Sequence, residues 1–156
     1  MAVFAPVWEM IKKHEGTEFE NVKYDAGGPT KFGITLANLP PGSTAQDIEN
    51  LTEEQAMAIA IKQFWNPIKG DTLDQKWATI LCDQSYERGV HGASNILASI
   101  NHGQAQPQLA FDFLKACAAA CVHHVTVDPT QAKFLAGWLN RINDLEAFLF
   151  DLHYAF

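Results

Sequence analysis

Glu15 stands at the end of an apolar helical pattern near the start of the chain, where a carboxyl group could do chemistry. Phe4, Trp8 and Ile11 share one helical face, and the position four residues further along lies on the same face. We therefore expect the Glu15 side chain among apolar and aromatic neighbours. A carboxyl group that loses hydration keeps its proton more readily and can act as a general acid. The alternative is that Glu15 begins a loop, points to water or caps a turn.

A second carboxyl group follows in the turn-rich stretch Asp25-Ala-Gly-Gly-Pro-Thr30. Its glycines permit positive φ and close approach of a ligand, while Pro29 stiffens the turn. An acid and a hydroxyl opposite a protonated Glu15 are the minimum equipment for hydrolysing a glycosidic bond. One acid protonates the leaving oxygen, and the other orients water or stabilises the developing positive charge. This spacing is also common in plain surface turns.

Helices must position these groups, because most of the chain has helical periodicity. Residues 17–41 are rich in turn residues and predict loops with one short hairpin. Apolar spacing and capping patterns predict helices over residues 3–15, 52–66, 73–89, 94–101, 109–123 and 128–152. No repeat or linker divides the chain. We predict a mainly α single domain over residues 1–156, with the catalytic motifs in 1–70 and a helical region in 71–156.

Bulk composition limits the function classes. The chain has 156 residues, 47% hydrophobic and 19% charged, which is typical of a globular domain with its own core. Its net charge of −7 and only 11 Lys and Arg residues argue against nucleic acid as a partner. No stretch resembles a signal peptide or a membrane span. Three cysteines without a CxxC pair suit a reduced compartment, so we expect cytoplasmic synthesis.

Residues 14–35, HEGTEFENVKYDAGGPTKFGIT, resemble the opening motif of glycoside hydrolase family 108. In that family a Glu-Gly-Gly element precedes an Asp-x-Gly-Gly-x-Thr-x-x-Gly-Ile-Thr element. Two later blocks are also similar to the family: Asp83-Gln-Ser-Tyr86 with Gly89, and Gly137-Trp-Leu-Asn-Arg141. The chain departs from the pattern at Thr17, which replaces the second glycine, and over residues 101–129, which diverge from the usual peptidoglycan-binding region.

The resemblance implies a lysozyme-like helical fold with a short loop and hairpin region after the first helix. It implies a muramidase that cleaves the β-1,4 bond between N-acetylmuramic acid and N-acetylglucosamine in peptidoglycan glycan strands, without a cofactor. Glu15 takes the position of the catalytic acid, and Asp25 and Thr30 match the acid and the hydroxyl. We expect substrate contacts at the following positions: Tyr24, Gly28, Gln84 and Tyr86. A position in the hydrophobic core is an equally good interpretation of Tyr86.

Two alternatives stay open: a catalytically weak or inactive wall-binding protein that retains the fold, and a related chitin-type glycosidase. The expected place of action is the cell wall in the periplasm, reached without a signal peptide. Delivery by a holin, a specialised secretion system or cell lysis would fit, and an immunity protein is a further candidate partner. No membrane association is expected.

Cys117, Cys121 and His124 fall on one predicted helix face at i, i+4 and i+7, a spacing that could hold a metal ion. Cysteines on such a face are more often small buried hydrophobic residues, and no fourth ligand is evident. We therefore predict no metal site. Neither a Ser-His-Asp arrangement nor a phosphate-binding glycine loop is present to indicate another enzyme class.

Overall fold

The first helix, α1, spans Phe4–Glu15 in the computed structural model, which describes residues 1–21, 28–100 and 103–150. Its buried side chains include Val7, Trp8 and Ile11, as the apolar spacing predicted. The helix ends at Gly16, where φ is 75° and the N–H donates to the Lys12 carbonyl oxygen. A glycine here ends the helix directly after Glu15.

A two-stranded antiparallel hairpin follows, as predicted. Strand β1 spans Thr30–Lys31 and β2 spans Ile34–Thr35, with Thr30 opposite Thr35. The two turn residues, Phe32 and Gly33, have φ values of 55° and 75°. Positive φ at both positions matches the right-handed twist of a tight hairpin. The turn therefore points the short Phe32-Gly33 segment back toward α1.

Short helices complete the first half of the chain. They are the 3-10 turn η1 (Leu36–Asn38), α2 (Ala45–Glu49), α3 (Glu53–Ala60), the π-helical turn η2 (Ile61–Trp65) and the 3-10 turn η3 (Gly70–Thr72). The predicted capping box at the start of α3 is present: Gln55 N–H donates to Thr52 Oγ1, and Thr52 N–H donates to Gln55 Oε1. These reciprocal bonds satisfy two donors at the helix start.

Three longer helices form the second half. Helix α4 (Gln75–Ile100) joins two helices that the sequence predicted separately, and Gly89, with φ 77° and ψ 150°, breaks it at the expected place. Helix α5 (Gln108–Val127) leads through the 3-10 turn η4 (Pro129–Phe134) into α6 (Leu135–Phe150). Asp128 accepts from the Thr130 N–H at 3.1 Å, which caps this turn.

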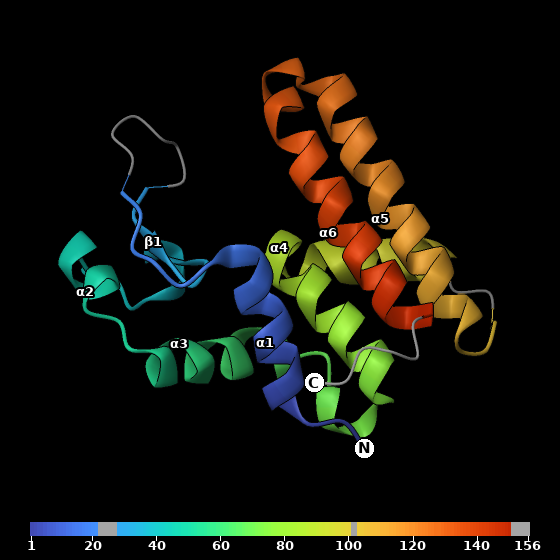
Figure 1. Cartoon of the computed structure of the whole chain (residues 1–156), viewed down its shortest axis with the longest axis horizontal. Coiled ribbons are helices and arrows are strands. Elements are labelled where there is room, and N and C mark those ends of the chain that lie inside the picture. The colour runs from blue at the N-terminus through green and yellow to red at the C-terminus, as the bar shows by residue number, and fades with distance from the viewer. Residues whose placement is uncertain (22–27, 101–102, 151–156) are drawn as a thin grey trace.

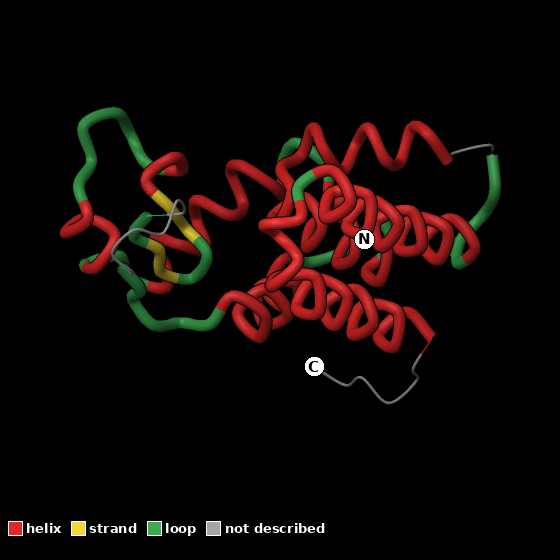
Figure 2. Tube along the Cα trace, turned by 90° about the horizontal axis from the view of Figure 1, so that it is seen from above, coloured by secondary structure: helices red, strands yellow, loops and turns green. Residues whose placement is uncertain are grey.

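The fold is mainly helical with one small hairpin, as predicted (Figure 1). The hairpin, α2 and α3 lie on one side of α1, and the α5–α6 pair projects from the other side above α4 (Figures 1 and 2). One hydrophobic core lies around α1, the hairpin and α3, and a second lies among α4, α5 and α6. No helix in the described ranges is long and apolar enough to cross a membrane.

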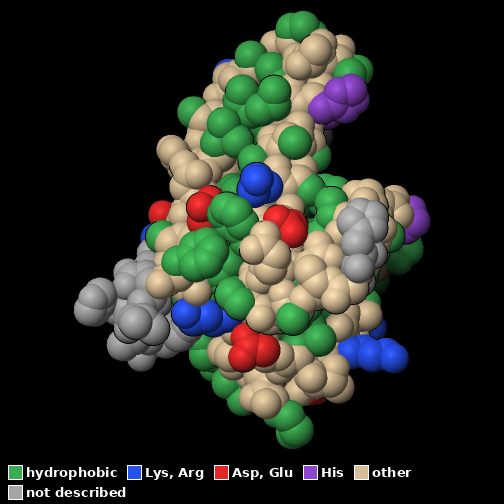
Figure 3. Space-filling view, turned by 90° about the vertical axis from the view of Figure 1, so that its right-hand side faces the viewer, with side chains coloured by type: hydrophobic (Ala, Val, Ile, Leu, Met, Phe, Trp, Pro, Cys, Tyr) green, Lys and Arg blue, Asp and Glu red, His purple; other side chains and the backbone are tan. Residues whose placement is uncertain are grey.

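Surface chemistry is mixed. On the face in Figure 3, Lys and Arg side chains are scattered, and hydrophobic side chains gather on the projecting part of the molecule. Large exposed hydrophobic residues near the turn between α5 and α6 include Val122, Val127 and Phe134, which are 49%, 70% and 43% exposed.

Candidate active site

Arg141 on α6 holds two acids that come from two other helices. Its Nε and Nη2 donate to Asp83 Oδ2 and Oδ1 over 2.9 and 3.0 Å, and its Nη1 donates to Glu15 Oε1. Asp83 is fully buried, and Arg141 is nearly so. Burial lowers the pKa of Arg141, but the Asp83 and Glu15 carboxylates more than offset this and raise it. A two-pronged bond to Asp83 fixes the guanidinium, which then fixes Glu15.

Glu15 lies where α1 meets the hairpin turn. A Cβ atom at Gly33 would come within 2.8 Å of Glu15 Cδ and Oε2, so only glycine fits against this side chain. Aromatic Tyr86 and Trp138 line the same cavity as Glu15, but the ion-pair partner of the carboxyl group, the Arg141 guanidinium, was not expected. Glu15 does lie on the inward face of α1, with 23% of its side chain exposed.

An open cavity of about 340 Å³ lies over Glu15. Its walls come from α1, the hairpin turn, α4 and α6, and its lining residues are His14, Glu15, Gly33, Tyr86, Glu87, Gly137, Trp138 and Arg141. The volume is within the usual range of small-molecule sites. The site therefore forms where both halves of the chain meet.

Glu87 on α4 is the second carboxyl group in this cavity. Its Oε2 lies 3.8 Å from Arg141 Nε, 3.9 Å from Arg88 Nη2 and 3.3 Å from Gln84 Nε2. Burial raises the pKa of Glu87, and the two arginines only partly oppose this. The cavity thus contains one carboxylate paired with Arg141 and a second acid whose charged form is disfavoured by burial.

Gln84 and Tyr86 occupy different positions, although both were expected to contact substrate. Gln84 is fully buried, donates to Glu87 and accepts from Arg88 at 2.7 Å, so it supports the cavity from behind instead of lining it. Tyr86 lines the cavity but is only 8% exposed, and its hydroxyl donates to the Phe32 carbonyl oxygen at 2.8 Å. Burial raises the pKa of Tyr86, which keeps this donor protonated. Tyr86 therefore ties α4 to the hairpin turn.

The remaining predicted residues lie along the segment after α1. Thr30 pairs with Glu20 through two backbone bonds of 2.8 Å and is not among the cavity-lining residues. Gly28 has φ 66°, the positive value that its place in the turn predicted. Tyr24 and Asp25 lie outside the described residues.

His14, next to Glu15, has an unusual environment. Among the described residues, its Nε2 is the one buried side-chain nitrogen or oxygen without a hydrogen-bond partner, and Asp144 Oδ2 lies 4.0 Å away. Burial lowers the pKa of His14, and Arg141 lowers it further, while Asp83 and Asp144 oppose both effects. Burial therefore disfavours the charged form of the imidazole that lines the cavity beside Glu15.

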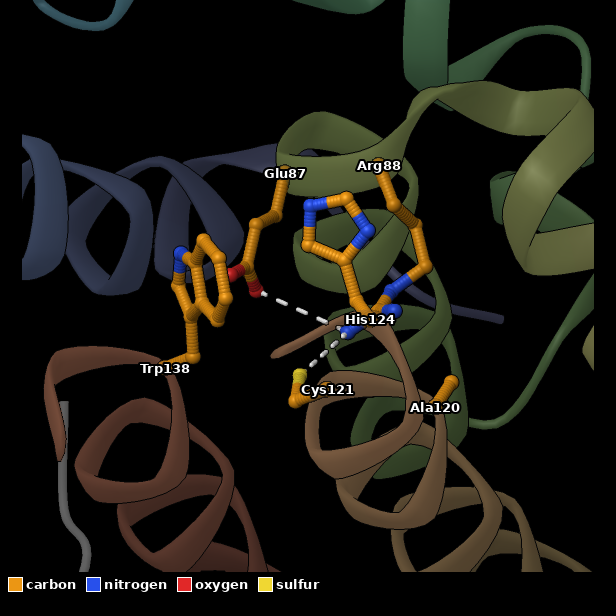
Figure 4. A pocket seen from close by; sticks show the side chains of 6 residues that line it. All are labelled: Glu87, Arg88, Ala120, Cys121, His124 and Trp138. Carbon is orange, nitrogen blue, oxygen red and sulfur yellow. Dashed lines mark hydrogen bonds and ion pairs between the residues drawn. The ribbon is translucent and has the colours of Figure 1, made fainter. Parts of the chain in front are cut away.

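A second cavity, of about 360 Å³, adjoins the first between α4, α5 and α6 (Figure 4). It shares Glu87 and Trp138 with the cavity over Glu15. Cys121 and His124 line it, whereas Cys117 is fully buried and burial raises its pKa to about 12. These three residues form no metal-binding group among the residues that the structure describes.

The family model of glycosyl hydrolase 108 matches residues 8–89, more than half of the chain. The chain belongs to this family. Members of glycosyl hydrolase 108 are glycoside hydrolases, so a glycan is the expected class of substrate. The solved structure of Brucella abortus SagA is similar, with a TM-score of 0.81 and 22% identity over 96% of this chain and 97% of that chain. At that identity the likeness concerns the fold. A search of curated proteins found no significant match.

Sequence reasoning missed several residues of the site. Arg141 stood in a quoted family block, but nothing local indicated that it would hold Glu15. Gly33 stood in the quoted opening motif, and its glycine is now explained by its contact with Glu15. Glu87 was not singled out. Its position one turn after the quoted Asp83 was the available signal, because residues i and i+4 share a helical face.

Proposed function

We propose that this glycosyl hydrolase 108 protein is an N-acetylmuramidase that cleaves the β-1,4 bond between N-acetylmuramic acid and N-acetylglucosamine in peptidoglycan. The observation that carries the proposal is the Glu15 carboxyl group, held by Arg141 at the wall of an open cavity between the two halves of the fold. The family match, which includes Glu15, supports a glycan as the ligand of this cavity.

In the proposed reaction Glu15 protonates the oxygen of the leaving sugar. The Arg141 guanidinium then stabilises the carboxylate that proton transfer leaves behind. Activity should fall as pH rises, because a general acid must carry its proton in order to donate it. Asp25 is proposed to orient water or stabilise the positive charge on the sugar, and Thr30 is proposed to position that water or Asp25. No cofactor takes part in this scheme.

Turbidity loss of purified peptidoglycan tests the proposal. Glu15→Gln should keep its fold and lose activity by about 100-fold or more, the usual share of a general acid. Glu18→Gln, an exposed acid three residues later, is the matched control and should retain wild-type activity. A folded Glu15→Gln variant that clears cell walls at the wild-type rate would show that the catalytic assignment is wrong.

Analysis of the reaction products identifies which glycosidic bond is cleaved. Reduction of the fragments with borohydride should convert muramic acid residues to their alditols, because a muramidase leaves muramic acid at the new reducing end. New reducing ends that carry N-acetylglucosamine, or cleavage of chitin oligomers that is faster than cleavage of peptidoglycan, would instead identify another glycosidase. Binding to peptidoglycan without any cleavage would identify a wall-binding protein that retains the fold.

The proposed place of action is the bacterial cell wall. A holin, a secretion system or cell lysis would bring the enzyme there, and an immunity protein is a candidate partner. Fractionation of producing cells, with the protein followed by antibody, tests the location: the proposal requires the protein in the wall fraction.

A further inference from the structure

The cavity next to the proposed catalytic one has no assigned role. It is lined by Glu87, Arg88, Ala120, Cys121, His124 and Trp138, whose side chains converge on one space in Figure 4. Two of these, Glu87 from α4 and Trp138 from α6, also line the cavity over Glu15. The two cavities therefore adjoin at these two side chains.

The side chains of the second cavity suit an amino sugar. Trp138 lines both cavities and gives them a flat aromatic wall, and its half-buried ring also packs against His124 with centroids 5.8 Å apart. Glu87 can accept hydrogen bonds from sugar hydroxyl groups, and the Arg88 guanidinium can donate to an acetamido oxygen. A few polar groups around an apolar wall are typical of small-ligand sites.

The polar groups are also held in place before any ligand arrives. Arg88 Nε and Nη2 donate to Gln84 Oε1 over 3.2 and 2.7 Å, and Nη2 lies 3.8 Å from Cys121 Sγ. Gln84 in turn donates to Glu87. Because these side chains are ordered by each other, a ligand would lose little affinity to ordering them.

We propose that the second cavity is a subsite for an N-acetylated amino-sugar unit of the same glycan strand whose bond is cut beside Glu15. The strand passes between Glu87 and Trp138, with the sugar in the second cavity against the Trp138 indole. This inference rests on the proposed function. It makes the enzyme sensitive to chain length, because only a fragment long enough to occupy both cavities gains the second set of contacts.

Ala120 allows the subsite to be blocked without touching the first cavity, since it lines the second cavity alone. Ala120→Leu should lower kcat/KM on long soluble glycan fragments by about tenfold or more, the usual effect of a lost pocket contact. It should leave kcat/KM unchanged on the shortest fragment that the wild type cleaves. Ala119→Leu, on the exposed side of the same helix, is the matched control and should behave as wild type.

A second pair of variants tests the subsite independently, in case Ala120→Leu misfolds. His124→Ala removes an exposed wall residue of the subsite, and His123→Ala removes its exposed neighbour, which does not line the cavity. His124→Ala should weaken cleavage of long fragments selectively, and His123→Ala should not. Equal behaviour within both pairs, or a loss that is the same for every fragment length, would overturn the subsite.

Binding measurements separate this inference from the proposed function. Calorimetric titration of Glu15→Gln with soluble glycan fragments of increasing length should show affinity that rises once both cavities can be filled. The rise should disappear in Glu15→Gln with Ala120→Leu. If the wild type cleaves no glycan but this length-dependent binding is seen, catalysis fails and the subsite stands. If cleavage is seen but affinity is independent of length and of Ala120→Leu, the subsite fails alone.

Discussion

At the scale of single residues, the site depends on a carboxyl group pressed between a guanidinium and a glycine. Arg141 holds Glu15 Oε1, and the hairpin turn approaches so closely that Gly33 has no room for a side chain. A general acid is effective only in the correct position relative to the bond that it protonates. Gly33 therefore contributes to the proposed catalysis, because it allows Glu15 to take this position.

Gly33→Ala should disturb this position. The added Cβ would lie 2.8 Å from Glu15 Cδ at a φ of 75°, so both the acid and the backbone must shift. We expect a stability loss of about 1–2 kcal/mol from the backbone alone, together with a marked loss of activity. Gly42→Ala is the control, because Gly42 also has positive φ but open space around it. Activity per folded molecule should fall for Gly33→Ala only, and equal activity in both variants would contradict the role of Gly33.

Glu87 should leave a signature in the pH dependence of stability. Burial raises its folded pKa above the unfolded value of about 4.5, so the folded state binds the proton more tightly. The resulting stabilisation is present below pH 4.5 and is lost as pH rises through the folded pKa. Glu87→Gln removes this loss, so its melting temperature should improve relative to wild type between pH 4 and 8. A difference in melting temperature between the two proteins that stays constant over this range would show that burial does not raise the pKa of Glu87.

At the scale of elements, α6 completes a site whose other parts lie on α1, the hairpin and α4. The link is Arg141, which reaches Glu15 on α1 and the fully buried Asp83 on α4. The position of the Glu15 carboxyl group therefore depends on how α6 packs against α1 and α4.

Arg141→Met should destabilise the fold strongly, because Asp83 would remain buried without its partner. Loss of one member of a buried ion pair costs about 3–5 kcal/mol. Arg141→Lys keeps the charge but not the two-pronged bond and should fall between Met and wild type. Urea denaturation measures the effect, with Lys62→Met on the surface as the control. A loss below about 1 kcal/mol for Arg141→Met would mean that Asp83 finds another partner or water.

The elements themselves could be predicted from the sequence, because their signals are local. Apolar spacing located α1, the Thr52 capping box located α3, and Gly89 marked the break in α4. The two helical parts of α4 on either side of Gly89 correspond to the two helices predicted separately, because a glycine with positive φ usually ends a helix.

The environment of the site residues could not be predicted in the same way. Periodicity placed Glu15 on an inward face but carried no information about Arg141, which is 126 residues away in sequence. It also could not show that polar Gln84 is fully buried, because an amide satisfied by neighbouring side chains looks the same in sequence as an exposed one. A hydrogen bond from a distant helix decides the first case, and tertiary packing over α4 decides the second.

At the scale of the whole molecule, net charge should govern the response to salt. The chain carries −7, and intact walls that are also anionic would repel it, so moderate salt should screen the repulsion and raise the rate on walls. On small soluble glycan fragments the salt effect should shrink, because less charge is brought together. Turbidity assays and fragment assays over a series of NaCl concentrations make the comparison. Steep inhibition by mild salt would point to a local basic patch that attracts the wall.

The 126-residue separation between Glu15 and Arg141 also determines when the proposed active site is completed during synthesis of the chain. A ribosome releases α1, the hairpin and α4 long before α6, so a growing chain holds its acid without the guanidinium that positions it. Contacts this distant in sequence close late in folding, after local helices have formed. Completion of the proposed active site is then among the last steps in the folding of the nascent chain.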